Sequence, residues 1–243
     1  MSNLYNDMIA RQKEIISQIN QEKIKNSKVT VVGCGGLGGT IIEQLIRSGF
    51  ENLTILDEDV FDKTNLNRQV RSNIDTLDKP KALITKEAMK KINPNITIDA
   101  KVERLCEDNV SKIIKDSDIV IDALDNIYSR VVLARASQEK GIPFIHSAVE
   151  KTSGQITVIT KNTPSYEELF RLKSKNKKLS DAREYLENLS NRKPQVLGIT
   201  PAIFGSLQVN EAIKIITESN DILYAPKVLL FDIANYSFRI IEF

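Results

Sequence analysis

The chain is poor in cysteine and histidine: Cys34, Cys106 and His146 are the only such residues among its 243. Two cysteines are too few for a disulfide framework or a four-cysteine zinc site. This scarcity predicts a reducing, cytoplasmic compartment. Cys34 lies where a small buried side chain is expected, and Cys106 follows a strand with no base nearby. We therefore interpret both cysteines, and the lone histidine, as structural rather than catalytic.

Long apolar runs and a charge imbalance are also missing. The most apolar stretch, 29–42, is rich in glycine and too short to span a bilayer. Charged residues interrupt the apolar positions of the first 16 residues, unlike a signal peptide. The 34 lysines and arginines nearly balance 32 aspartates and glutamates, giving a net charge of +2. Such a balance argues against a membrane or nucleic-acid partner.

Strand-like and helix-like segments alternate over the first 149 residues. This alternation predicts an α/β protein with a doubly wound, Rossmann-like sheet that is mostly parallel. Strands are expected at 28–33, 52–57, 96–102, 118–124 and 143–149, and helices at 37–49, 79–92, 110–116 and 130–141.

The flanking segments have different patterns. Residues 3–26 predict one amphipathic N-terminal helix, and 154–160 alternates in the manner of an antiparallel strand. A polar, lysine-rich segment with a short helix at 181–189 follows, then a helix at 201–217 and a hairpin around Asn235. We expect a single domain, 1–243, in four parts: a helical arm (1–27), a nucleotide-binding core (28–160), a crossover loop (161–197) and a C-terminal helix and hairpin (198–243).

A glycine motif with a downstream acid indicates a nucleotide site. Gly33, Gly35 and Gly38 have the spacing G-x-G-x-x-G between a strand and a helix. These glycines permit a tight turn, close approach of a phosphate and packing of helix on strand, and the helix N-terminus offers free N–H groups. Asp57 ends the next strand, where it can accept hydrogen bonds from ribose hydroxyls. The motif alone does not distinguish NAD from ATP.

Polar residues after Asp57 favour ATP. Asn65, Arg68, Gln69 and Lys81 gather there, and a dehydrogenase has no use for them. Arg68 and Lys81 are suited to neutralising a triphosphate while charge builds on a pyrophosphate leaving group.

Two carboxylates stand at the end of a further strand. Asp122 and Asp125 follow the apolar residues 119–121 at the edge of the sheet where ligands bind. A carboxylate among phosphates is a natural ligand of Mg²⁺.

Several segments, taken in order along nearly the whole chain, resemble the ThiF/MoeB/HesA family, bacterial relatives of ubiquitin-activating enzymes. They include "ARQ" at 10–12, "LTILDEDVFDKTNLNRQ" at 53–69, "DKPKA" at 78–82, "DALDN" at 122–126 and "GSLQVNEAIK" at 205–214. The resemblance implies use of ATP and Mg²⁺ to adenylate the C-terminal carboxylate of a small ubiquitin-like sulfur-carrier protein, typically ending in Gly-Gly. The products are an acyl-adenylate and pyrophosphate.

The resemblance also implies residue roles. Arg11 would enter the site of the partner subunit in a homodimer, and Asp125 would position Mg²⁺. The implied catalytic residues are Arg11, Arg68, Lys81 and Asp125. The implied nucleotide-binding residues are Gly33, Gly35, Gly36, Gly38, Asp57, Asp59, Asn65, Arg68, Lys81, Asp125 and Asn126.

The chain departs from the family pattern in two ways. Ser165 and Glu168 occupy the place of the first of two CxxC pairs that hold zinc in many members, and the second pair is missing, so no zinc is expected there. The segment 190–201 lacks the cysteine that thioester-forming and sulfur-transferring members carry. We therefore expect adenylation without a covalent intermediate on this segment.

Other functions stay open at this point. Family branches that activate a tRNA-linked carboxylate or a peptide C-terminus are enzymatic alternatives. An NAD-dependent oxidoreductase explains Gly33 to Asp57 but leaves the later motifs without a role. A non-catalytic scaffold is opposed by the presence of Arg11, Arg68, Lys81 and Asp125 together. The identity of the carboxylate is not readable from the sequence. The lysine-rich loop 171–193 could close over a carrier's C-terminal tail.

Overall fold

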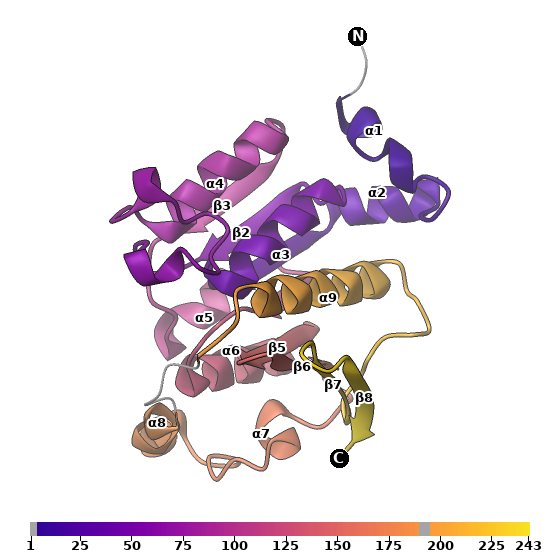
Figure 1. Cartoon of the computed structure of the whole chain (residues 1–243). Helices are drawn as coiled ribbons and strands as arrows, with labels where there is room; N and C mark the ends of the chain where they lie inside the picture. The colour runs from indigo at the N-terminus through magenta and orange to yellow at the C-terminus, as the bar shows by residue number, and fades with distance from the viewer. Residues whose placement is uncertain (1–3, 190–194) are drawn as a thin grey trace.

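An eight-stranded sheet runs through the described residues, 4–189 and 195–243, of this computed structural model (Figure 1). The strand order is β3-β2-β1-β4-β5-β6-β7-β8. The strands are β1 Lys28–Val32, β2 Asn52–Leu56, β3 Thr97–Lys101, β4 Ile119–Asp122, β5 Phe144–Glu150, β6 Ser153–Ile159, β7 Lys227–Asp232 and β8 Ser237–Glu242.

The sheet has a parallel half and an antiparallel half. Strands β3, β2, β1, β4 and β5 are parallel neighbours, and β5, β6, β7 and β8 are antiparallel ones. The central strands β1 and β4 are buried along nearly their whole length because helices cover both of their faces. Val31 and Ile121, paired across them, are fully buried. These findings confirm the doubly wound, mostly parallel fold with antiparallel C-terminal strands.

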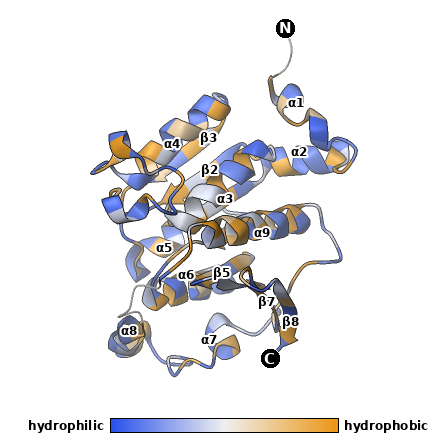
Figure 2. Ribbon diagram, in the orientation of Figure 1, coloured by the Kyte–Doolittle hydropathy of each residue, from blue (hydrophilic) through white to orange (hydrophobic). Residues whose placement is uncertain are grey.

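Two layers of helices sandwich the sheet. One face packs against α2, α3, α4 and α9, and the other against α5, α6, α7 and α8. Figure 1 shows α3 and α9 side by side, and Figure 2 shows hydrophilic and hydrophobic residues alternating along α2 and α4. The helices are α3 Gly36–Arg47, α4 Lys81–Ile92, α5 Glu107–Ile113, α6 Ile127–Lys140, α7 Tyr166–Leu169, α8 Leu179–Asn188 and α9 Ile199–Ile216.

Helix α9 is fastened to the strand ends by a buried amide. Gln208 is fully buried, and its Nε2 donates to the carbonyl oxygens of Asp122 (2.8 Å) and Ile145 (3.2 Å). Its neighbour on the same helix, Gly205, approaches the Leu37 carbonyl of α3 so closely that an added Cβ would lie 3.0 Å away. The helix therefore lies tightly against both β4 and the helix that follows the glycine loop.

The prediction of one helix over 3–26 is wrong. The arm consists of α1 Leu4–Met8, a 3-10 turn Ala10–Gln12, and α2 Gln18–Asn26. A new helix begins at α2 because the Ser17 hydroxyl accepts a hydrogen bond from the Asn20 N–H and caps it. Ile15 and Ile19 are 84% and 74% exposed, so two of the apolar positions do not join the core.

The segment between β6 and α9 contains more structure than its polar composition indicates. The short helix expected at 181–189 is confirmed as α8, while α7 was not anticipated. The closing hairpin is confirmed as β7 and β8. Residues 190–194, which belong to the predicted crossover loop, lie outside the described residues. Within 4–189 and 195–243, none of the helices is long and apolar enough to cross a lipid bilayer.

The start of α3 supplies a test of this packing. A Cβ on Gly38 would overlap the carbonyl oxygen of Gly33, whereas one on the adjacent Gly39 would come nearest to the Val70 side chain, at 3.1 Å, and would clash with no backbone atom. We expect Gly38→Ala to lower the free energy of unfolding by about 3 kcal/mol, because backbone must move. Gly39→Ala, the matched control, should stay within about 1 kcal/mol of the wild type. Equal urea midpoints for the two variants would contradict this packing.

Candidate active site

A cavity of about 1510 Å³ opens at the carboxyl ends of the parallel strands. Ligands bind at this edge in open α/β sheets. Every nucleotide-binding residue expected from the sequence, except Gly38, lines the cavity: Gly33, Gly35, Gly36, Asp57, Asp59, Asn65, Arg68, Lys81, Asp125 and Asn126. Residues that are far apart in the chain therefore meet in one place.

The glycine loop forms the floor of the cavity. Gly33 has φ +103°, a conformation that L side chains rarely adopt, and a Cβ there would meet the Ala123 carbonyl. Helix α3 begins at Gly36, so its first N–H groups have no partner within the helix and point toward the cavity end. Such a terminus is suited to a phosphate group. Gly38 lies behind the loop, against Gly33, which matches its expected role in helix packing.

Asp57 joins the end of β2 to the glycine loop. Its Oδ2 accepts from the Cys34 N–H at 2.7 Å, and its Oδ1 accepts from the Asp59 N–H at 2.9 Å. Burial raises the pKa of this carboxyl, although those hydrogen bonds and the nearby Lys81 oppose the shift. Each carboxylate oxygen retains a free lone pair. The side chain is therefore oriented and still able to accept hydrogen bonds from a ribose.

Lys81 stands at the first position of α4 with most of its side chain buried. Its ammonium lies 2.8 Å from Asp59 Oδ2, and its side chain is 8% exposed against 63% for that of Asp59. The backbone N–H of Lys81 also donates to the Asp59 carbonyl at 2.9 Å. The cation is therefore held in place by a partner that is itself open to solvent.

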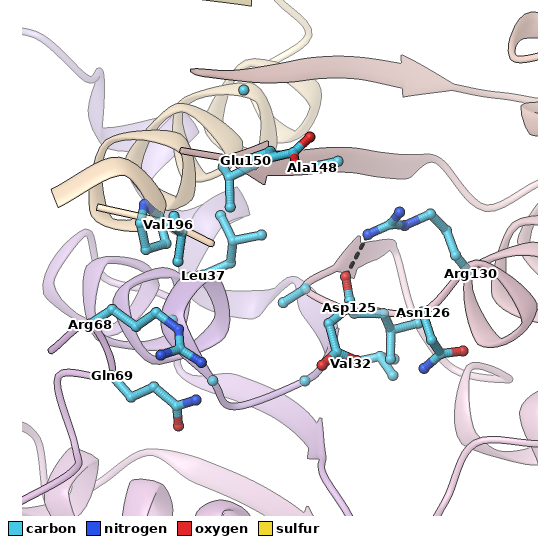
Figure 3. Close-up of a pocket in the computed structure, with 18 of the residues that line it drawn as sticks. Val32, Leu37, Arg68, Gln69, Asp125, Asn126, Arg130, Ala148, Glu150 and Val196 are labelled. Atoms are coloured by element: carbon cyan, nitrogen blue, oxygen red, sulfur yellow. Dashed lines mark hydrogen bonds between the residues drawn. The ribbon is translucent and has the colours of Figure 1, made fainter. Parts of the chain in front are cut away.

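Arg68 and Asn65 come from the turn after β2. Asn65 is buried at the end of the 3-10 turn Lys63–Asn65, where its Oδ1 accepts from the Asp62 N–H. Arg68 Nη1 donates to the Thr64 carbonyl and to Asn67 Oδ1, both at 2.8 Å. Figure 3 shows Arg68 and Gln69 on one side of the cavity and Asp125 and Asn126 on the other.

Asp125 faces the cavity from the loop between β4 and α6. Its side chain is exposed, and within the described part of the chain its carboxylate takes part in no hydrogen bond or ion pair. Asn126 caps α6 by accepting from the Ser129 N–H at 2.8 Å. The donor chemistry fits Mg²⁺, which combines one or two carboxylates with phosphate oxygens and water. No group of three or more His, Cys, Asp or Glu in the described residues could hold a metal ion by itself.

The parallel half of this sheet and its motif order have counterparts in known proteins. Residues 8–243 match the ThiF family. This chain belongs to the ThiF family.

Relatives within the ThiF family cover most of the chain. Molybdopterin-synthase adenylyltransferase of Haemophilus influenzae is 37% identical over 197 residues, 80% of this chain and 76% of that protein. The SAMP-activating enzyme E1 of Haloferax volcanii is 30% identical over 223 residues, 92% of this chain and 79% of that protein. The crystal structure of E. coli MccB with ATP has a TM-score of 0.80 at 21% identity, covering all of this chain and 72% of that one. This structural likeness confirms the fold.

The residues at which the chain departs from the family pattern have structural roles. Ser165 and Glu168 form a capping box at the start of α7, because each side chain accepts from the backbone N–H of the other. Cys34 is buried, and burial first, then the Asp57 charge, raises the pKa of its thiol. A thiol that stays protonated is a poor nucleophile. Arg11 is exposed and is not among the described residues that line the cavity.

Sequence reasoning missed several cavity residues. Arg104, on the connection between β3 and α5, and Arg130, in α6, add two cations to the lining. Arg130 could have been found from its place one turn after Asn126, whereas nothing in the sequence marks Arg104. Residues of the antiparallel half were also missed because strand pairing alone brings them to the cavity: Ala148, Gly154, Gln155, Leu230, Phe231 and Arg239.

His146 and Asp122 form a fully buried pair beside the cavity. His146 Nδ1 lies 2.7 Å from Asp122 Oδ2, and Gln155 Nε2 lies 3.2 Å from His146 Nε2. An amide N–H can donate to Nε2 only if that nitrogen carries no proton. Burial lowers the pKa of His146, against the hydrogen bond with Asp122, and Arg130 already neutralises that carboxylate. His146 is therefore a neutral structural residue, and Asp122 does not face the cavity.

This neutral histidine makes stability depend on pH. In the unfolded chain a histidine has a pKa of about 6.5 and binds a proton as pH falls, whereas folded His146 does not. The unfolded state therefore gains protons, and stability falls below about pH 6.5. Between pH 7.5 and pH 5.5, this histidine should lower the free energy of unfolding of the wild type by up to about 1.4 kcal/mol.

His146→Gln should lack this pH dependence. Urea titrations at pH 7.5 and pH 5.5 should therefore show that the variant's free energy of unfolding comes closer to that of the wild type at the lower pH. If the difference in free energy of unfolding between wild type and variant instead grows on acidification, His146 is protonated in the folded protein.

Proposed function

We propose that this chain adenylates the C-terminal carboxylate of a small ubiquitin-like sulfur-carrier protein. Members of the ThiF family are ATP-dependent adenylyltransferases. The curated relatives include a sulfur carrier protein adenylyltransferase of Thermus thermophilus, 30% identical over 225 residues, 90% of this chain and 79% of that protein. The observation that carries the proposal is the single cavity that unites the glycine loop, Arg68, Lys81 and Asp125.

The cavity residues predicted from the sequence have distinct tasks in this reaction. The glycine loop and the N-terminus of α3 receive phosphate oxygens, and Asp57 accepts from the ribose. Arg68 and Lys81 stabilise negative charge on the departing pyrophosphate, because both cations are already oriented by short hydrogen bonds. Bound at Asp125, Mg²⁺ would supply further neutralisation of the phosphates.

The antiparallel half offers a place for the substrate's tail. Gly154 has no room for a side chain, because a Cβ there would lie 2.6 Å from the Phe204 ring. Ala148 and Gly154, from β5 and β6, line the cavity together with the glycine loop. A slender terminus such as Gly-Gly suits this lining, and its carboxylate oxygen would attack the α-phosphorus as the bond to pyrophosphate breaks.

The metal-binding role of Asp125 is tested by ATP–pyrophosphate exchange. With a carrier ending in Gly-Gly, the wild type should exchange labelled pyrophosphate into ATP, and the same carrier without its last glycine should not support exchange. Asp125→Asn should lower the rate at least about 100-fold. Asp116→Asn, an exposed carboxylate outside the cavity, is the control. If Asp125→Asn exchanges pyrophosphate as fast as the wild type, Asp125 does not bind a metal that the reaction needs.

A homodimer with Arg11 acting on the partner's site makes a second prediction. Arg11→Ala and Asp125→Asn should each be inactive alone. Mixed and allowed to exchange subunits, they form heterodimers with one intact site of two. A random mixture should recover about a quarter of the wild-type exchange rate. A mixture that stays inactive although mass analysis shows heterodimers would exclude action in trans.

A further inference from the structure

The antiparallel half of the sheet forms one wall of the cavity with a row of side chains. Strand pairing places Ala148, Gln155, Leu230 and Arg239 next to one another across β5, β6, β7 and β8, and all four line the cavity. Paired residues of a sheet project their side chains to the same face. Figure 3 shows the first member of the row, Ala148, beside the cavity. A substrate tail lying in this half of the cavity would therefore contact this row.

The backbone at Gln155 is already used by the sheet. Gln155 pairs with Ala148 on one side and with Leu230 on the other, so β6 is an interior strand at this point. The N–H and C=O groups of an interior strand are occupied by the two ladders. Both neighbours in the row have apolar side chains. The polar group that the middle of this wall offers to a ligand is therefore the Gln155 carboxamide.

A buried hydrogen-bond chain fixes the orientation of that carboxamide. Gln155 Nε2 lies 3.2 Å from His146 Nε2, and His146 Nδ1 lies 2.7 Å from Asp122 Oδ2. The same carboxylate oxygen accepts from Arg130 Nε at 2.7 Å. An ionised carboxylate has no proton to donate, so the neutral histidine carries its proton on Nδ1 and accepts at Nε2. Gln155 therefore turns its NH₂ group toward His146.

The other end of the Gln155 carboxamide is an open acceptor. Within 4–189 and 195–243, Oε1 accepts no hydrogen bond, and it is not enclosed by protein atoms. A carboxamide oxygen accepts hydrogen bonds and cannot donate them. The ligand group that suits it is an N–H, such as a backbone amide of an extended chain, which is costly to bring into a cavity without an acceptor.

We propose that Gln155 binds the C-terminal tail of the carrier, with its Oε1 accepting a hydrogen bond from an N–H of the terminal Gly-Gly. The inference rests on the proposed adenylation of such a carrier and names the side chain that holds its tail. The pair of His146 and Asp122 contributes indirectly, because it determines which end of the carboxamide faces the cavity. ATP takes no part in this contact, since the predicted nucleotide-binding residues belong to the parallel half.

A double-mutant cycle between enzyme and carrier tests the contact. The Gly-Gly-ended carrier is made by semi-synthesis, and in two further versions the N–H of the last or of the next-to-last glycine is replaced by an ester oxygen. ATP–pyrophosphate exchange at varied carrier concentration gives KM and kcat. For the wild type, one of the ester versions should have a KM for the carrier about tenfold above that of the all-amide version.

Gln155→Met removes the acceptor at nearly constant length. It should raise the KM for the all-amide carrier about tenfold and leave the KM for ATP unchanged. It should also lose the ester penalty, because no acceptor is left for the N–H. Gln155→Lys, which can still donate to His146 Nε2 but cannot accept, should behave in the same way. This second variant separates the lost contact from any effect of leaving the buried histidine unpaired.

Gln138→Met is the matched control. Gln138 is also partly buried, its Nε2 donates to the carbonyls of Thr160 (3.0 Å) and Thr163 (3.1 Å), and it is not among the described residues that line the cavity. This variant should keep the wild-type KM for the carrier and the full ester penalty. An ester penalty that persists undiminished in Gln155→Met and Gln155→Lys would overturn the proposal. So would a wild type that treats all three carrier versions alike.

Failure of the inference and failure of the proposed function are distinguishable. A wild type that exchanges pyrophosphate with the all-amide carrier, but shows no coupling between Gln155 and either ester, refutes this contact and leaves the proposed function intact. A wild type that exchanges with no Gly-Gly-ended carrier refutes the proposed function, and the contact with it.

Discussion

The buried carboxylate of Asp122 is the constraint on which the catalytic edge of the sheet depends. The Asp122 carboxylate is fully buried, and a buried charge is tolerated only when it is paired and hydrogen-bonded. Here Arg130, His146 and the Leu124 N–H provide the partners, and Gln208 binds the Asp122 carbonyl. These residues come from α6, β5, the loop after β4 and α9. The carboxylate and the backbone carbonyl of Asp122 together therefore fix how four elements meet beside the glycine loop.

The cavity combines two kinds of structure. Parallel strands contribute loops at their carboxyl ends, which is where charged and polar side chains for phosphates gather. Antiparallel strands contribute small residues such as Ala148 and Gly154, set by the pairing of β5 with β6. A nucleotide suits the first part and an extended chain terminus suits the second. Their continuity in one cavity makes transfer between the two chemically reasonable.

Much of the fold was predictable, because βαβ alternation restricts the topology strongly. The glycine motif, Asp57 and Asp125 were found from the sequence, since each follows a strand that places it at the same edge. The break in the N-terminal arm was missed because the hydrophobic period continues across Ser17, which caps a new helix. Gln155 was missed because the pairing of β5, β6 and β7, rather than nearness in the sequence, brings it to the cavity. The roles of the cavity residues in catalysis stay predictions.

The most direct measurement of the central claim follows the label of ATP marked at the α-phosphate or at the γ-phosphate. The full chain is incubated with Mg²⁺ and a Gly-Gly-ended carrier, and the carrier is analysed before the acyl-adenylate hydrolyses. Adenylation predicts that the α label moves to the carrier and that the γ label leaves as pyrophosphate. Transfer of the γ label to the carrier, with release of ADP, would contradict the account.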